Sequence, residues 1–78
     1  MSIKYVNNEQ IIIEIKKIML ESKVSQREIA KNIGITPQGL TKLLNKKNFG
    51  FEDAQKILNA MGYELIVDFQ VNNERVTD

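Results

Sequence analysis

The sequence predicts a mainly α-helical fold of four short helices followed by one β-strand near the C-terminus. Three observations lead to this prediction. Apolar residues recur at helical spacing, capping residues and glycines mark where segments end, and the pattern changes to a period of two after Gly62. A chain of 78 residues suffices for one domain with one small core. We expect a single domain over residues 1–78, with a helical part at about 8–62, a strand at about 63–71 and a frayed tail at 72–78.

The first helix is predicted over residues 8–22. Asn7 and Gln10 have the spacing of an N-cap residue and its reciprocal partner. Ile13 and Leu20 cannot face inward together with the main apolar stripe, so they are candidates for a dimer or partner surface. The stripe itself recurs at helical spacing and is assigned to the core: Ile11, Ile15 and Ile18.

Two short helices follow, separated by a tight turn. Ser25 and Glu28 form the pattern of a capping box that opens the first of them, and Gly34 stands where a left-handed residue ends it. Thr36 is the N-cap of the next helix, and Pro37 occupies its first position, where a missing N–H costs nothing. The inward-facing residues of the two helices are predicted to be Ile29, Ala30, Ile33, Leu40, Leu43 and Leu44.

The fourth helix is predicted over residues 51–61, with Gly62 as its stop. Phe49 and Phe51 flank a glycine just before it, and we expect both rings to plug the core from this loop.

The segment after Gly62 is predicted to be a strand that pairs with a second strand. Apolar residues alternate with polar ones from Tyr63 to Val71, and only Ile66 breaks the pattern. A lone strand is unstable in water, so it needs a partner. Residues 3–6 of the same chain are one candidate, and the same strand of a second copy, in a two-fold ribbon, is the favoured one. The predicted dimer interface then consists of Tyr63, Leu65, Val67 and Phe69.

Several function classes are excluded or disfavoured by residues that the chain lacks. It contains no cysteine, so disulfides and thiolate metal sites are excluded. It contains no histidine, so the commonest metal ligand and the commonest acid–base catalyst are missing. We therefore expect no enzyme activity, no metal and no cofactor. The apolar runs are too short to span a bilayer, and acidic residues interrupt the N-terminal one, so we expect a cytoplasmic protein without a membrane partner.

Residues 26–45 carry the most specific signal, because two short helices joined by a glycine-containing turn are typical of a helix-turn-helix motif. Ala30 stands where the second helix must cross the first, and a larger side chain there would push the two apart. The order and spacing of three runs resemble the phage-repressor-like family (Cro and lambda repressor, or XRE): residues 25–30, 34–36 and 40–45. The resemblance covers roughly residues 9–62 and implies a four-helix lambda-repressor-like fold. The strand resembles that of small family members that dimerise through a terminal strand.

The resemblance implies that the helix at about 37–46 lies in the major groove of double-stranded DNA. Its base-contacting side chains are then Gln38, Thr41 and Lys42, where Gln38 suits adenine and Lys42 suits guanine. Pro37 departs from the pattern, since many relatives carry a polar base-reading residue there. Contacts to the DNA backbone are assigned to Gln26, Arg27, Thr36, Asn45, Lys46, Lys47 and Asn48.

The charges are distributed unevenly along the chain although their sum is only +1. Residues 25–48 carry five basic residues and one acidic residue, and residues 49–78 carry two basic and six acidic ones. The basic block coincides with the helix-turn-helix motif and the acidic block with the predicted dimer strand.

Two functions are consistent with these observations. The first is a homodimeric transcriptional repressor that binds a palindromic operator sequence-specifically. The second is a protein-interaction module, such as an antitoxin or an inhibitor, that binds a protein partner such as a toxin, with DNA binding secondary or absent. The apolar residues Ile13, Leu20 and Ile66 motivate the second function.

Overall fold

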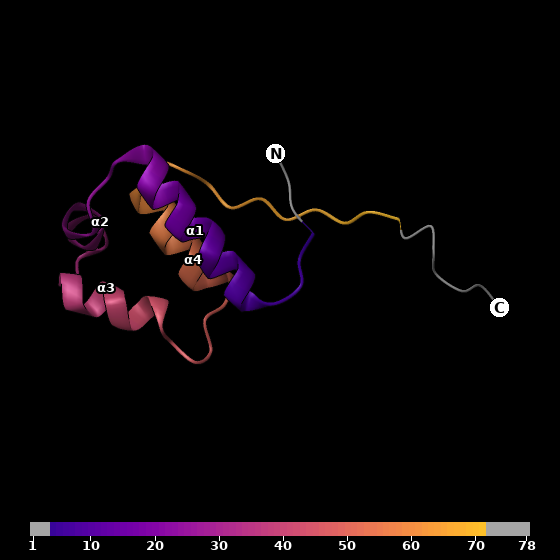
Figure 1. The fold of residues 1–78 in the computed structure, drawn as a ribbon, viewed down its shortest axis with the longest axis horizontal. Coiled ribbons are helices and arrows are strands. Elements are labelled where there is room, and N and C mark those ends of the chain that lie inside the picture. Colours follow the sequence, from indigo (N-terminus) through magenta and orange to yellow (C-terminus); the bar gives the residue numbers. More distant parts are fainter. Residues whose placement is uncertain (1–3, 72–78) are drawn as a thin grey trace.

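The computed structural model describes residues 4–71, and this part of the chain folds into four α-helices. They are α1 (Asn8–Ser22), α2 (Gln26–Ile33), α3 (Pro37–Leu44) and α4 (Phe51–Ala60). As Figure 1 shows, α1 and α4 lie side by side, and α2 and α3 close one end of the pair. The mainly helical fold and the four helices confirm the prediction from the sequence. No helix in the described range is long and apolar enough to cross a membrane.

Each of the first three helices begins at the predicted cap. The side-chain oxygens of Asn7, Ser25 and Thr36 accept hydrogen bonds from backbone N–H groups three residues later, at 3.0, 3.1 and 3.0 Å. These bonds satisfy donors that a helix leaves without internal partners. Gly34 ends α2 in the left-handed region, with φ at 93°. The N–H of the next residue, Ile35, donates a hydrogen bond to the Ala30 carbonyl at 2.9 Å. Helix starts and stops of this kind depend on neighbours a few residues away, which is why the sequence reveals them.

The core lies between α1, α4 and the α2–α3 pair, and Phe49 closes it from the loop before α4. The Phe49 ring is only 1% exposed, and its carbonyl accepts a 2.6 Å hydrogen bond from Asn8 at the start of α1. The remaining buried apolar residues are Ile15, Met19, Ile29, Ala30, Leu40, Leu44, Ala54, Ile57 and Leu58. Phe49 therefore joins the loop before α4 to the start of α1.

The prediction that Phe51 also plugs the core is wrong. Its side chain is 47% exposed at the first position of α4. There it packs edge-on against Tyr5, with the ring centroids 6.2 Å apart. The buried face of α4 begins with Asp53 and Ala54, so Phe51 lies at the rim of the core.

The predicted strand is not formed within the single chain: residues 63–71, which we call the C-terminal arm, have no strand pairing, nor has any other described segment. The physical reason is that a strand needs a neighbour to receive its backbone hydrogen bonds, and residues 4–7 do not provide one. Ile3, and the tail predicted to fray at 72–78, lie outside the described residues. The arm departs from α4 through Gly62, whose φ is 83°, and Figure 1 shows it running past the helices.

Candidate nucleic-acid interface

The predicted helix-turn-helix motif is formed by α2 and α3. Ala30 and Leu40 are completely buried where the two helices pack, in agreement with the need for a small residue at the crossing. The amide of Asn32 donates to the Ala60 carbonyl at 3.0 Å and so joins α2 to the end of α4. The motif is thereby fixed against the rest of the bundle, and the opposite faces of α2 and α3 are left to solvent.

The three predicted base-contacting residues are exposed together on the outer face of α3. Gln38 and Lys42 are four residues apart, so they lie one helical turn from each other on the same face. Neither side chain has a hydrogen-bond partner among the described residues. The Thr41 hydroxyl donates to the Pro37 carbonyl at 3.2 Å, so its proton is used inside the helix while its methyl group stays free. Asn45 likewise donates to the Thr41 carbonyl at 2.9 Å. Gln38 and Lys42 are therefore the side chains best prepared to bond base edges.

The residues assigned to the DNA backbone are also exposed, and they lie at both ends of the outer face. Gln26 and Arg27 stand at the N-terminus of α2, where free N–H groups attract anions. Thr36 is at the start of α3 and is already used as its cap. The rest lie at the end of α3 and in the loop after it: Asn45, Lys46, Lys47 and Asn48.

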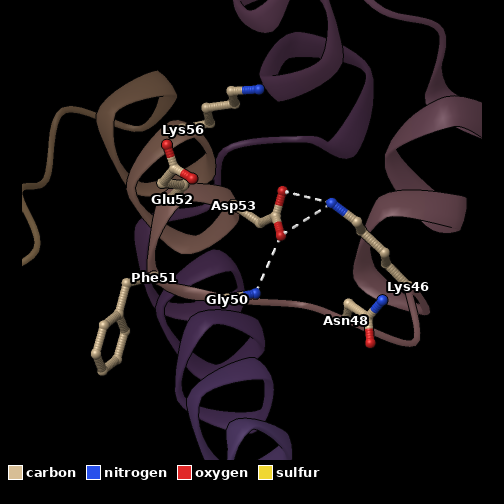
Figure 2. A pocket seen from close by; sticks show the side chains of 7 residues that line it. All are labelled: Lys46, Asn48, Gly50, Phe51, Glu52, Asp53 and Lys56. Atoms are coloured by element: carbon tan, nitrogen blue, oxygen red, sulfur yellow. Dashed lines mark hydrogen bonds and ion pairs between the residues drawn. The ribbon is translucent and has the colours of Figure 1, made fainter.

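Lys46 is held by a cluster that the sequence did not reveal. Its ammonium lies 3.3 Å from both carboxylate oxygens of Asp53, and one of those oxygens also accepts the Gly50 N–H at 3.0 Å. Figure 2 shows these groups at the wall of a hollow between the end of α3 and the start of α4. The pattern glycine, then aspartate three positions later, predicts the cap of α4, but the reach of Lys46 across seven residues has no sequence signal. Lys46 can meet a phosphate only in competition with Asp53.

The Asp53 cluster makes the stability of the fold dependent on pH. The pKa of the buried Asp53 carboxyl lies below its ordinary value. The hydrogen bond from the Gly50 N–H is the largest cause, and the Lys46 ammonium lowers the pKa further, whereas burial acts to raise it. A carboxyl with a lowered folded-state pKa contributes stability above the unfolded-state pKa of about 3.9. That contribution is lost as pH falls through the folded-state value.

We therefore expect Asp53→Asn to be less stable than the wild type at pH 7 by about 1–3 kcal/mol, because a charged hydrogen-bonded group is lost. The difference should shrink as the pH is lowered below about 4. Urea unfolding followed by circular dichroism between pH 7 and pH 2.5 measures it. A difference that stays constant over this range contradicts the role given to the charge.

Residues 4–71 show no candidate metal site. They contain no group of three or more acidic residues placed to hold a metal ion, and no buried side-chain polar atom lacks a hydrogen-bond partner. The exposed faces of α2 and α3, with the loop after them, carry the predicted DNA-contacting residues and form the candidate site.

Comparison with protein families agrees with this geometry. A model described as helix-turn-helix matches residues 15–67, which is more than half of the chain. The chain belongs to this family, the helix-turn-helix proteins of XRE, or Cro and lambda-repressor, type. No significant match to a curated protein or to a solved structure was found.

Membership of the helix-turn-helix family confirms the general function predicted from the sequence, which is DNA binding in transcription regulation. The match begins at Ile15 inside α1 and ends at Val67 in the arm, so it includes the motif, the second half of α1 and all of α4.

Proposed function

We propose that this helix-turn-helix protein binds a palindromic DNA operator as a homodimer and represses transcription. The observation that carries the proposal is the outer face of α3. Gln38 and Lys42 project from it one helical turn apart, with no hydrogen-bond partner among the described residues, and Lys46 and Lys47 follow at its end.

In the proposed complex, the N-terminal half of α3 lies in the major groove. Gln38 pairs with adenine, Lys42 donates to guanine, and the methyl group of Thr41 contacts a thymine methyl. Gln26, Arg27 and Thr36 contact phosphates on one side of the groove. The other side is held by Asn45, Lys46, Lys47 and Asn48.

The charge distribution supports a dimer that depends on two such contacts. The motif segment, residues 25–48, carries a net charge of +4, from five basic residues and one acidic residue. The whole chain has a net charge of only +1, so its electrostatic attraction to DNA of any sequence is weak. Tight binding therefore requires two motifs that contact the DNA together. A dimer places the second motif about 34 Å away, one turn along the same face of the duplex.

Selection from a pool of random duplexes, combined with sedimentation of the complex, tests this proposal. We expect an enriched palindrome with half-sites about one helical turn apart and two chains for each duplex. Binding should weaken steeply with added salt. A chain that enriches no sequence, or that binds its enriched site as a monomer, contradicts the proposal.

A protein-interaction module is the second candidate, and the exposed apolar side chains of α1 favour it. Leu20 is 81% exposed, and Ile13 is about half exposed two turns away on the same helix. If the protein is an antitoxin or inhibitor, this surface binds a protein partner such as a toxin in a stoichiometric complex. Leu20→Glu is then expected to abolish that complex. Loss of operator selection in the same variant instead assigns the surface to the DNA-bound dimer.

A further inference from the structure

We infer that Asp53 lowers the affinity of this protein for DNA, because it binds Lys46 in the free chain and their ion pair must break before Lys46 reaches a phosphate. The inference rests on the proposed phosphate contact of Lys46. It adds a positioning residue in α4 that sets the strength of DNA binding through Lys46 and touches no DNA itself.

The Asp53 carboxylate is held in place by its own helix. Asp53 is buried, with 8% of its surface exposed, at the third position of α4. One of its carboxylate oxygens accepts the Gly50 N–H at 3.0 Å. The carboxylate cannot turn away from this position without losing that hydrogen bond, whose loss would leave a charge poorly solvated. It is therefore a fixed acceptor, already in place when the chain meets DNA.

The Lys46 ammonium is bound to this acceptor symmetrically, at 3.3 Å from each carboxylate oxygen. In Figure 2 the Lys46 side chain extends from the end of α3 toward the start of α4, and Asp53 points back at it. The Lys46 side chain is still 49% exposed, so a phosphate can reach it by displacing the carboxylate. DNA binding then gains only the difference between the phosphate contact and the broken ion pair.

Two neighbouring residues carry the same charges without this restraint. Lys47 follows Lys46 directly, is exposed, and makes no ion pair within residues 4–71. Glu52 precedes Asp53, is exposed, and points away from Lys46 in Figure 2. Each is a matched control, because its substitution changes the net charge equally and leaves the Lys46–Asp53 pair intact.

Asp53→Asn tests the inference by the affinity for a random-sequence duplex at fixed salt. The amide oxygen can still accept the Gly50 N–H, but it carries no charge to hold Lys46. We expect binding to tighten about two- to fivefold although the fold is less stable, whereas a merely structural role predicts weaker binding. Adding Lys46→Ala to this variant is expected to abolish the gain and to reduce the slope of log affinity against log salt by about 0.9.

Glu52→Gln is the control for the change in net charge and is expected to tighten binding less than Asp53→Asn does. Circular dichroism at the assay temperature verifies that each variant is folded. Equal gains from the two substitutions overturn the inference. So does a folded Asp53→Asn variant that binds no more tightly than the wild type, or a gain that survives the addition of Lys46→Ala.

A second comparison keeps Asp53 and therefore does not depend on whether Asp53→Asn folds. Lys46→Ala is expected to weaken binding to the random duplex less than Lys47→Ala does, because Lys46 gives up its ion pair to bind and Lys47 does not. An equal or greater loss from Lys46→Ala overturns the inference.

Both comparisons use DNA without an operator, so they are independent of sequence selection. A wild type that enriches no sequence overturns the proposed repressor function, and the random-duplex measurements still decide the role of Asp53. Conversely, absence of any effect of Asp53→Asn on binding overturns this inference and leaves the proposed function standing.

Discussion

Replacing Gln38 and Lys42 by alanine is expected to remove the preference for the operator while the domain stays folded. Each bidentate contact to a base contributes about 1–3 kcal/mol of discrimination, so two of them amount to at least about a 30-fold loss of selectivity per half-site. Both side chains are exposed and have no hydrogen-bond partner among the described residues, so their loss costs the fold little. Competition binding of operator against random duplex, at fixed salt, measures the effect.

The matched control removes the same two residue types from another exposed face. Gln55→Ala with Lys56→Ala on α4 changes the net charge equally but leaves α3 untouched. This control should keep the operator preference. If the α3 variant still selects the same sequence as the wild type, α3 does not read the DNA, and the proposed function is wrong in its central part.

Truncating Phe49 is expected to have the largest effect on stability. Phe49→Ala leaves a cavity beneath the loop that joins α3 to α4, at a cost of about 3–5 kcal/mol. A domain of this size has a total stability of about 4–12 kcal/mol, so the variant is expected to be partly or wholly unfolded at 25 °C. The midpoint of urea unfolding, measured by circular dichroism, reports the loss.

Phe51→Ala is the control for Phe49→Ala, since it makes the same chemical change two residues away. The exposed Phe51 ring contacts Tyr5 edge-on, and such a pair contributes about 0.5–1.5 kcal/mol. Similar losses in the two variants contradict the assignment of Phe49 as the residue that closes the core.

The two phenylalanines illustrate where prediction from the sequence reached its limit. They flank the same glycine, and both are large apolar residues of the kind that a loop buries. Which of them enters the core depends on the path of the loop, which is set by contacts with α1 such as the bond from Asn8 to the Phe49 carbonyl. Those contacts join residues about forty positions apart, so no local pattern records them.

The candidate site likewise has features that the sequence predicts and features that only the structure shows. The exposure of Gln38 and Lys42 follows from helical periodicity once Leu40 and Leu44 are recognised as buried, so the sequence was sufficient to nominate them. The ion pair between Lys46 and Asp53 and the internal bond of Thr41 depend on side-chain geometry, and only the structure shows that these groups are already engaged.

The sequence by itself determined where three helices begin, where α2 stops, and that α2 and α3 form the motif of a DNA-binding family. These features depend on caps, glycines and spacings that act within a few residues of one another. The tertiary structure alone decided that Phe49 and not Phe51 enters the core, that Lys46 is held by Asp53, and that the C-terminal arm finds no partner strand in the described part of its own chain. Packing, ion pairs between different elements and strand pairing join residues from separate segments, so they exist only once the helices have come together.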